Sequence, residues 1–525
     1  ETGIEFDYCC VHASMALRDL GFETVMVNCN PETVSTDYST SDRLYFEPLT
    51  PEDLAEVIEA ERAACTDGAR VRGVIVSLGG QTPLKLAHSV DPSLILGTPV
   101  ASIDAAEDRQ HWARICNEIG LAQPPGGTAV TLEQARAIVA EIGFPVLVRP
   151  SYVLGGRAMQ IVYDHDGLER AMADLTSAHG SLAREGGVSA TRPILLDRFL
   201  DDAVEVDVDA LRDRDGAVFV AGVMEHVEEA GVHSGDSACM LPPQSLSDDV
   251  IESLRDATAR IAAALDVVGL VNVQYAVKDG AVYVLEANPR ASRTVPFVAK
   301  ATGVPLAQVA VRLMVGETLA DLRAAGVVPA TTPAPRHVSV KEAVLPFNRF
   351  PGVDIVLGPE MRSTGEVMGI GPTFGVAYAK SQMAAGTPLP DRGEVFLSFA
   401  DPDKSLGLDI ARDLSALGFT LAATIGTAGF LRSHGVHVDT LVGKIGGPDG
   451  AHDAVTLLNE GRIALVINTP SGSGARRDGQ AIRTTAVQRK VPCVTTMRGA
   501  RAVVEAVTAS RAQGWSYQPL QEMHR

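Results

Sequence analysis

Two strand-like segments joined by a tight turn constrain this chain more than any other feature. Residues 270–277 (LVNVQYAV) and 281–287 (AVYVLEA) are separated by Lys278, Asp279 and Gly280. An Asp-Gly pair between runs of alternating apolar residues is a strong signal for a β-hairpin. Helix-like segments lie on both sides of this hairpin in the sequence. We therefore predict an α+β region with antiparallel strands here, rather than a doubly wound sheet.

The polar side chains of this hairpin point to a metal site. With a three-residue loop, 274 lies opposite 284, and Gln274 and Glu286 become diagonal neighbours on one face, roughly 7–8 Å apart at Cα. Asn288 follows two residues later on the same side. Three oxygen-bearing side chains in one patch suit Mg²⁺, which prefers oxygen ligands and substrate phosphates. A two-residue turn would break this alignment, and a solvated polar face explains the pattern equally well.

Two arginines just beyond the hairpin favour a binding site over a solvated face. Arg290 and Arg293 follow Asn288 closely in the sequence. Two cations beside an acidic cluster fit a site that binds a transferring phosphate and a carboxylate-type substrate.

A glycine-rich loop after another predicted strand is a candidate phosphate site. The segment 147–157 contains Arg149 in the strand, followed by Gly155 and Gly156. Adjacent glycines let backbone N–H groups approach phosphate without a Cβ clash, and the arginine can reach the α- and β-phosphate oxygens. Taken alone, such a loop is more often an ordinary tight turn.

Two more segments carry candidate nucleotide contacts. Backbone groups from Arg198 to Leu200 can read an adenine edge, and Glu205 can accept hydrogen bonds from ribose hydroxyls. A polar loop over 231–236 contains His233. Taken alone, the first segment also fits a strand exit with surface charges, and a lone loop histidine is usually solvated.

The chain divides into several predicted domains. Strands alternate with helices near both ends, which predicts parallel sheets covered on both faces. We predict an α/β domain over 1–102, an α+β domain over 103–383, a linker over 384–393 and a second α/β domain over 394–525. The first domain opens at a helix without a preceding strand, and no Met begins the sequence. We therefore expect the chain to be a piece of a longer protein.

Composition excludes several classes of protein. The 45 Lys and Arg against 65 Asp and Glu give a formal charge of −20, which argues against nucleic acid or an anionic membrane surface as partner. No apolar run approaches the roughly 18 residues of a membrane span. The seven cysteines include no CxxC pair, so neither a disulfide scaffold nor a zinc ribbon is expected. Reduced thiols of a cytoplasmic protein are the expectation.

The last domain carries a candidate anion site. Thr424 and Thr427 lie between a predicted strand and helix, where hydroxyls and N–H groups at a helix start bind anions. Lys444, Asn468 and Thr469 follow later strands, at the carboxyl edge where ligands sit in open α/β sheets. A threonine-rich helix cap without a ligand is the alternative.

Together and in this order, these segments resemble the ATP-grasp fold, and nearly the whole chain resembles the C-terminal half of the carbamoyl phosphate synthetase large chain family. The resemblance is strong through the first two predicted domains and looser in the last. It is carried by IEFDYCCVHA (4–13), NCNPETVSTDY (28–38), GGQTPLKLA (79–87), RPSYVLGGRAM (149–159), GVHSGDSA (231–238), EANPRASRTVPF (286–297) and PFNRFPGVD (346–354).

The resemblance implies both a fold and an activity. The three domains would be a Rossmann-like pre-ATP-grasp domain, an ATP-grasp domain and a methylglyoxal-synthase-like regulatory domain. The activity would be phosphorylation of carbamate to carbamoyl phosphate, with ATP as donor and Mg²⁺ or Mn²⁺ as metal, for pyrimidine and arginine biosynthesis. Carbamate would form in the preceding half of the large chain and travel inside the protein. That N-terminal half and a glutaminase small subunit would be the partners.

The resemblance also implies roles for individual residues. Nucleotide contacts would come from Arg109, Arg149, Gly155, Gly156, Arg198, Leu200, Glu205, Gly231, Val232, His233, Ser234, Gln274 and Glu286. Gln274, Glu286 and Asn288 would hold metal, and Arg290 and Arg293 would face carbamate and the transferring phosphoryl group. A nucleotide effector, UMP or IMP, would bind Thr424, Thr427, Lys444, Asn468 and Thr469. An ornithine site maps loosely to Glu228, Asp236 and Glu342, and whether ornithine acts here stays open.

Two other hypotheses compete with this one. Another ATP-grasp ligase, of the carboxylase or peptide-ligase type, is disfavoured by the long match at 28–38 and 346–354, outside the nucleotide motifs. A non-catalytic regulatory or assembly module is disfavoured by the intact hairpin cluster and its two arginines, because a module freed from catalysis has no physical need for clustered charge.

Overall fold

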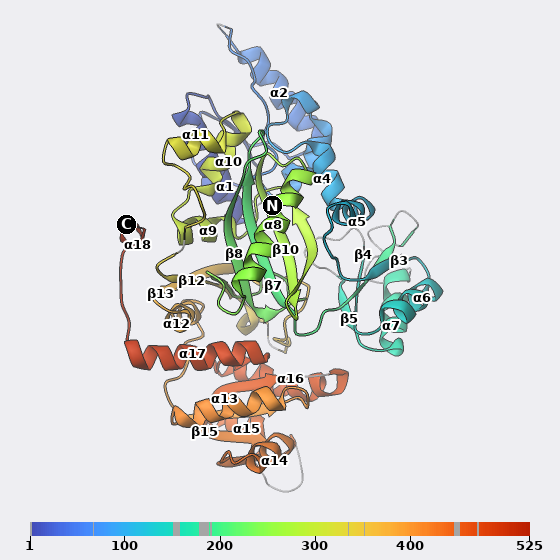
Figure 1. Cartoon of the computed structure of the whole chain (residues 1–525), viewed down its shortest axis with the longest axis vertical. Coiled ribbons are helices and arrows are strands. Elements are labelled where there is room, and N and C mark those ends of the chain that lie inside the picture. The colour runs from blue at the N-terminus through green and yellow to red at the C-terminus, as the bar shows by residue number, and fades with distance from the viewer. Residues whose placement is uncertain are drawn as a thin grey trace.

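Four β-sheets organise the part of the chain that the structure describes. The structure is a computed structural model, and it describes residues 3–66, 68–150, 158–177, 188–189, 192–333, 335–350, 352–445, 452–469 and 472–524. Helices cover the sheets in a mixed α/β and α+β architecture of several units (Figure 1). The predicted fold class is confirmed.

The first unit is small and its sheet has two strands. The parallel strands are β1 (Val25–Val27) and β2 (Arg43–Tyr45), and the helices are α1 (Ile4–Asp19), α2 (Pro51–Ala64) and α3 (Gln81–Leu86). Residues 73–77 add no further strand to this sheet, and Val74 forms only an isolated bridge with Ile95. The buried face of α1 packs against α9 (Val295–Thr302) and α10 (Leu306–Val315), two helices beside the seven-stranded sheet described below. The first unit therefore shares one core with that sheet.

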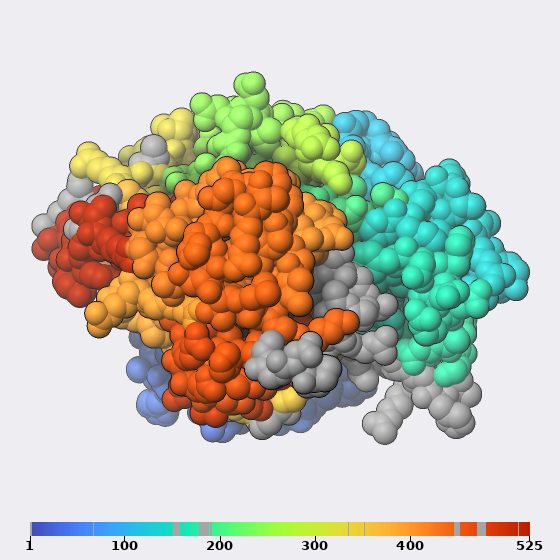
Figure 2. Space-filling model, turned by 90° about the horizontal axis from the view of Figure 1, so that it is seen from below, coloured from blue at the N-terminus to red at the C-terminus, as the bar shows by residue number. Residues whose placement is uncertain are grey.

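A second sheet of four strands projects from one side of the molecule (Figures 1 and 2). Its order is β3 (Gly126–Ala129), β6 (Ile194–Arg198), β4 (Val146–Pro150) and β5 (Gln160–Val162). Helices α6 (Leu132–Ile142) and α7 (His165–Thr176) cover one face, where Val148 packs against Leu168 and Met172. Because side chains alternate along a strand, Arg149 lies on the opposite, helix-free face.

The seven-stranded sheet forms the centre of the molecule. Its order is β11 (Ala281–Asn288), β10 (Gly269–Lys278), β7 (Val204–Arg212), β8 (Val218–Glu229), β9 (Cys239–Leu241), β12 (Val338–Val344) and β13 (Gly365–Gly371). Helix α8 (Asp248–Ala264) packs on one face. On the other face lie α1, α9 (Val295–Thr302) and α10 (Leu306–Val315), with α11 (Leu319–Ala324) beside them.

Two short helices connect the first unit to the four-stranded sheet. The structure has α4 (Val100–Glu107) and α5 (Arg109–Glu118), separated at Asp108. The backbone of Asp108 is extended, and its side chain accepts a hydrogen bond of 2.8 Å from the N–H of His111. This N-cap starts a new helix and so separates α4 from α5.

The C-terminal unit is an open parallel sheet. Its order is β16 (Thr440–Val442), β15 (Thr420–Thr424), β14 (Glu394–Phe399), β17 (Ile463–Thr469) and β18 (Cys493–Val494). The surrounding helices are α13 (Lys404–Ala416), α14 (Ile425–Ser433), α15 (Ala454–Asn459), α16 (Gly472–Gln488) and α17 (Met497–Gln513), followed by α18 (Leu520–Met523).

The C-terminal unit shares its core with the central sheet. Helix α17 lies between the two in Figure 1 and packs against α12 (Phe374–Ala384). One apolar cluster contains Val340 and Tyr378 from the central region together with Leu397 and Val503 from the C-terminal unit. The two regions therefore contact each other through buried apolar side chains, although the stretch between α12 and β14 has the composition of a linker.

No single helix among the described residues is long and apolar enough to cross a membrane. Helices α9 and α10 reach that length and apolar composition only as a pair, and they are bent by 108° at the break between them. Most of their side chains are buried in the core beside the central sheet.

Candidate active site

The hairpin β10–β11 differs from its predicted register. Its turn has two residues, Asp279 and Gly280, both with positive φ (51° and 79°), so Lys278 pairs with Ala281. Positive φ at both positions is the signature of the tight hairpin turn that Asp-Gly favours. The prediction of a three-residue loop, and of 274 opposite 284, is therefore wrong.

A β-bulge nevertheless brings the predicted side chains together. The register shifts after Gln274, where Leu285 is the extra residue on β11, and Gln274 pairs directly with Glu286. Gln274 and Glu286 are thus cross-strand partners rather than diagonal ones. Asn288 donates a hydrogen bond of 3.0 Å to Oε1 of Glu286, so all three predicted metal ligands lie in one patch.

The donor chemistry of this patch suits a hard cation shared with phosphate. It offers one carboxylate and two side-chain amides, and Glu286 is exposed. Among the residues that the structure describes, no group of three or more His, Cys, Asp or Glu could hold a metal ion. Mg²⁺ commonly uses only one or two protein carboxylates and completes its shell with waters and substrate phosphates. The metal site at these three residues therefore stays a prediction.

The loop between β8 and β9 lies beside the patch. Gln274 donates to the hydroxyl of Ser234 at 3.3 Å. The N–H of Gly235 donates to Nδ1 of His233 at 3.0 Å, which places the proton of a neutral imidazole on Nε2. Burial, and then the charge of Arg293, lower the pKa of His233. A neutral His233 can therefore donate a hydrogen bond from Nε2 to a ligand.

Gly231, at the start of this loop, has a conformation and a position that exclude other residues. Its φ is +102°, and an added Cβ would clash with the ring of Phe199. The ring comes from the strand exit that carries Arg198 and Leu200, so the two predicted nucleotide segments pack directly against each other.

The two arginines after the hairpin are held near the patch. Arg290 donates to Oδ1 of Asn288 at 3.0 Å, and burial lowers its pKa. Nε of Arg293 lies 3.6 Å from a carboxylate oxygen of Glu5, and its Nη1 contacts the sulfur of Met361 at 2.8 Å. Both predicted cations therefore lie at the end of the hairpin.

A buried carboxylate positions the arginine loop. Asp209, fully buried on β7, accepts hydrogen bonds from Asn272 at 2.9 Å, Ser292 at 2.8 Å and Thr294 at 2.6 Å. Ser292 and Thr294 flank Arg293 in the chain. Burial raises the pKa of Asp209 to about 6, although its hydrogen bonds act in the opposite direction. Sequence reasoning missed this anchor.

A buried histidine–aspartate pair lies next to Asp209. Nε2 of His226 lies 2.9 Å from a carboxylate oxygen of Asp207, and both side chains are buried. Burial lowers the pKa of His226, but the hydrogen bond to Asp207 and its charge outweigh burial, and the pKa is raised. Sequence reasoning missed this pair, although the alternation of acids at 205, 207 and 209 could have indicated that these side chains share one face.

Glu205 and a small apolar patch adjoin the same face. Glu205 is 4% exposed and accepts a hydrogen bond of 3.3 Å from the N–H of Gly231. Burial raises its pKa to about 7, which the charge of His226 partly opposes. Close to Glu205, which pairs with Ala276, lies a cluster of small apolar side chains, formed by Leu200, Ala203, Ala230, Ala276 and Leu285. Of these, only Leu200 was predicted as a nucleotide contact. Leu285 could not be predicted, because it reaches this face through the bulge.

Three more predicted nucleotide residues lie on or against the four-stranded sheet: Arg149 on β4, Arg198 at the end of β6, and Arg109 at the start of α5. Arg109 forms a two-point ion pair with Asp197, and Nε of Arg149 lies 3.3 Å from the same carboxylate. Nε of Arg149 makes no hydrogen bond with it, so this buried donor is unsatisfied. Arg198 instead donates to the backbone carbonyls of Ile142 and Phe144. Gly155 and Gly156 lie outside the described residues.

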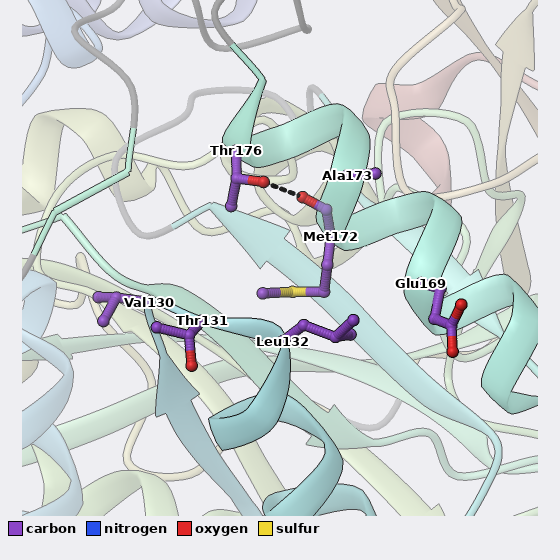
Figure 3. Close-up of a pocket in the computed structure, with 7 residues that line it drawn as sticks. All are labelled: Val130, Thr131, Leu132, Glu169, Met172, Ala173 and Thr176. Carbon is purple, nitrogen blue, oxygen red and sulfur yellow. Dashed lines mark hydrogen bonds between the residues drawn. The ribbon is translucent and has the colours of Figure 1, made fainter.

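A pocket in the same unit lies away from these groups. It has a volume of 270 Å³ and lies between the start of α6 and the side chains of α7 (Figure 3). Met172 and Leu132 line it, together with Glu169. Met172 also packs against Val148, on the face of the sheet opposite Arg149. The pocket therefore belongs to the helix-covered face and not to the candidate site.

The predicted effector residues meet at one edge of the C-terminal sheet. Thr424 caps the start of α14 and donates to the hydroxyl of Thr427 at 3.1 Å. The hydroxyls of Thr427 and Thr469 accept backbone N–H groups from residues 399 and 400, at the end of β14. Lys444 follows β16, and the residues just beyond it are outside the described part of the chain.

Sequence reasoning missed one cation at this edge. Lys404 begins α13, and its amino group lies 2.6 Å from Asp401 and 3.8 Å from where a Cβ on Gly426 would be. The rule that ligands bind at the carboxyl ends of parallel strands could have identified Lys404, because it follows β14 by only a few residues.

The residues mapped to ornithine form two different environments. Burial, and then the charge of Glu228, raise the pKa of Glu342 to about 8, and Gln382 donates to Glu342 at 2.5 Å. Asp236 is 1% exposed and accepts backbone N–H groups from Arg362 at 2.7 Å and Ser363 at 2.8 Å. Glu228 and Glu342 therefore lie close enough to affect each other, whereas the carboxylate of Asp236 is turned towards backbone.

Three family descriptions match the sequence in order. They are the carbamoyl phosphate synthase preATP-grasp domain over residues 1–105, the carbamoyl-phosphate synthase L chain ATP binding domain over 108–322, and the MGS-like domain over 407–495.

Solved structures show the same fold at low sequence identity. The biotin carboxylase domain of Hydrogenobacter thermophilus 2-oxoglutarate carboxylase, in complex with MgADP, ADP and bicarbonate, has a TM-score of 0.56 at 17% identity. The likeness covers 73% of this chain and 88% of that one. N5-carboxyaminoimidazole ribonucleotide synthetase from Thermus thermophilus has a TM-score of 0.53 at 17% identity, over 74% of this chain and 98% of that one.

Curated relatives match almost the full sequence. Carbamoyl phosphate synthase large chains from Streptomyces coelicolor and Archaeoglobus fulgidus are 53% and 52% identical, each over 99% of this chain. The large chain from Pasteurella multocida is 55% identical over 96%. The chain spans about half the length of these relatives, 47%, 46% and 45% respectively. With the three domain matches, these identities show that the chain belongs to the carbamoyl phosphate synthase large chain family.

Proposed function

We propose that this chain phosphorylates carbamate to carbamoyl phosphate, with ATP as the phosphoryl donor. The observation that carries the proposal is the direct pairing of Gln274 with Glu286, next to Asn288 and the two arginines. A carbamate oxygen attacks the γ-phosphorus, the bond to the β,γ-bridging oxygen breaks, and ADP leaves. Such a transfer needs in-line positioning and neutralised charge, and little covalent chemistry from the protein.

The chain's own residues would supply this positioning. Arg290 and Arg293 neutralise the carbamate and the phosphoryl oxygens, and Nε2–H of His233 donates to a phosphate oxygen. The carboxylate of Asp209 holds the arginine loop through Ser292 and Thr294. Gln274, Glu286 and Asn288 would hold Mg²⁺ or Mn²⁺, which would neutralise negative charge on the phosphates.

The adenosine end would lie along β7 and β10. The apolar cluster with Leu200 and Leu285 suits the face of a purine. Glu205 would accept from ribose hydroxyls, and Arg109 and Arg149 would reach phosphate once they part from Asp197. This arrangement needs the four-stranded sheet to close over the nucleotide, with Gly155 and Gly156 in the loop that follows Arg149.

The wider context of the reaction is also a proposal. We propose three domains, over 1–102, 103–383 and 394–525, with 384–393 as the linker between the last two. Carbamate would come from the N-terminal half of the large chain, with ammonia from a glutaminase subunit, and the product would serve pyrimidine and arginine biosynthesis. UMP or IMP would bind at the C-terminal sheet edge, and ornithine near Glu228 and Glu342.

Glu286→Ala tests the proposed reaction. Removing the carboxylate of Glu286 should nearly abolish ATP synthesis from carbamoyl phosphate and ADP, and the fold should persist because the side chain is exposed. Asp279→Asn is a matched control that removes an exposed acid from the turn of the same hairpin. Near-normal ATP synthesis by Glu286→Ala would contradict the assignment, as would equal losses in both variants.

A further inference from the structure

An ion pair with a buried arginine joins the C-terminal unit to the ATP-grasp region. Arg483, on α16, is fully buried. Its Nε and Nη2 donate to the two carboxylate oxygens of Asp354, at 2.7 and 2.5 Å, and its Nη1 donates to Oδ1 of Asn468 at 2.7 Å. Asp354 lies between β12 and β13, whereas Asn468 lies at the end of β17. One guanidinium therefore contacts both regions.

Asn468 is the end of this bridge that a ligand would contact. It lies beside Thr469, at the sheet edge that carries the other candidate effector residues. Arg483 can only donate, so the oxygen of Asn468 faces it and the amide N–H₂ is left to bind anionic oxygens. A Cβ on Gly479 would collide with Arg483 and lie 2.8 Å from Oδ1 of Asn468. The bridge is thus closely packed, and a displaced Asn468 displaces Arg483.

The other end of the bridge continues to the ATP site. The carbonyl of Gly358, four residues after Asp354, accepts the N–H of His233 at 2.9 Å. The N–H groups of Arg362 and Ser363 donate to the buried carboxylate of Asp236 at 2.7 and 2.8 Å. The segment 352–363 therefore holds both His233 and Asp236 of the loop that faces Gln274.

The same segment contacts the arginine loop. Nη1 of Arg293 lies 2.8 Å from the sulfur of Met361, which is part of this segment. A shift of segment 352–363 therefore reaches two groups of the proposed reaction, one on each side of the hairpin patch.

We propose that the Asp354–Arg483–Asn468 bridge transmits nucleotide binding at the C-terminal sheet edge to loop 231–236, and so changes the affinity of the ATP site for its nucleotide. This inference rests on the proposed nucleotide binding at both sites. The paired hydrogen bonds between a planar guanidinium and a carboxylate fix their relative orientation, so Asp354 follows Arg483. By linkage, a nucleotide at the ATP site changes effector affinity by the same factor.

Asp354→Asn tests the bridge. An amide has nearly the same shape, but it cannot accept both guanidinium N–H groups or neutralise the charge. Calorimetric binding of UMP and of IMP would be measured on the 525-residue chain, with and without Mg²⁺ and ADP. In wild type we expect ADP to change the affinity of one of them by roughly 5-fold or more, within the usual range of such couplings. In Asp354→Asn this ratio should fall to within about twofold of one, with the affinity without ADP within about threefold of wild type.

Gln480→Ala is the matched control. Gln480 lies on the same helix and donates to the carbonyl of Gly352 at 3.2 Å, and it does not bridge to Asn468. This variant should keep the wild-type coupling ratio. Equal loss in both variants would assign the effect to the interface as a whole and would overturn the bridge.

A measurement on wild type covers the case in which Asp354→Asn does not fold. Addition of the binding nucleotide should change amide hydrogen exchange in peptides from 352–363 and 231–236, and unchanged exchange in both would overturn the proposal. Unaltered coupling in a folded Asp354→Asn variant would overturn the bridge alone. A wild type that binds neither UMP nor IMP would overturn the proposed effector site, and the bridge with it.

Discussion

Replacing Glu205 by glutamine should change how the stability of the ATP-grasp region depends on pH. Glu205 is 4% exposed, and burial raises its pKa from 4.5 to about 7. A carboxyl group whose pKa is higher in the folded than in the unfolded state stabilises the fold while it is protonated, and that contribution is lost as the pH rises through the folded-state pKa. Between pH 5 and 8, a change from 4.5 to about 7 removes about 2.5 kcal/mol from the free energy of unfolding.

Glu205→Gln lacks this loss because the amide does not titrate. The variant keeps the acceptor for the N–H of Gly231, which lies 3.3 Å from the carboxylate. Its free energy of unfolding relative to wild type should therefore rise by about 2.5 kcal/mol from pH 5 to pH 8. Asp209→Asn gives a contrasting case: burial raises the pKa of Asp209 from 3.8 to about 6, so the same interval should give only about 1.4 kcal/mol.

Trp112 offers a local probe for this measurement. It is 4% exposed and packs in the same cluster as Val206 and Val208, beside Glu205 on β7. Urea unfolding followed by its fluorescence, in a Trp515→Phe background, would report on this region rather than on the C-terminal tail. Equal pH dependence in wild type and Glu205→Gln would refute the argument that burial of Glu205 destabilises the fold at neutral pH.

The same variant should lose affinity for nucleotide. A hydrogen bond to a charged acceptor contributes more than one to a neutral acceptor, by about 1 kcal/mol, so Glu205→Gln should bind ADP roughly fivefold more weakly at pH 8. Titration of both proteins with MgADP checks this. Unchanged affinity would remove Glu205 from the proposed ribose site, even if the stability prediction holds.

Three further changes have distinct expected results. Arg149→Lys keeps the charge but loses the planar fork, so the KM for ADP in ATP synthesis should rise about tenfold or the rate should fall, and an unchanged profile would indicate a purely structural ion pair with Asp197. Lys444→Ala should weaken UMP or IMP binding in calorimetry, and unaltered binding would remove Lys444 from the pocket. Gly231→Ala should lower stability by about 2 kcal/mol or more, because it adds a Cβ against Phe199 at a φ of +102°, and an unaltered melting temperature would contradict that packing.

The hairpin shows how far sequence patterns reach. Alternating apolar residues around Asp279-Gly280 correctly predict the hairpin, and the polar residues correctly predict which side chains meet. The register was wrong because loop length and the bulge are separate properties. The two-residue turn moves the partner of Gln274 from 284 to 285, and the extra residue Leu285 moves it once more, to Glu286, so Gln274 reaches Glu286 by a route that local pattern does not encode.

Buried polar partners were beyond sequence reasoning for a related cause. The acids at 207 and 209 were visible as an alternating pattern, but their partners are distant in the chain. Asp209 binds Asn272, 63 residues away, and Thr294, 85 residues away. A long sequence separation carries no local signal, and only the order of strands β10, β7 and β8 brings these groups together.

The boundary at 384–393 illustrates the same limit on a larger scale. A glycine- and proline-rich stretch indicates a flexible connection, which by itself favours independent domains. The structure instead has α12 packed on α17, with Tyr378 and Val503 in one apolar cluster. A fully buried Arg483 crosses the same boundary. Because close-packed apolar contacts resist sliding, the transmission that we propose would run through these neighbouring side chains, and the length of the connecting stretch would not limit it.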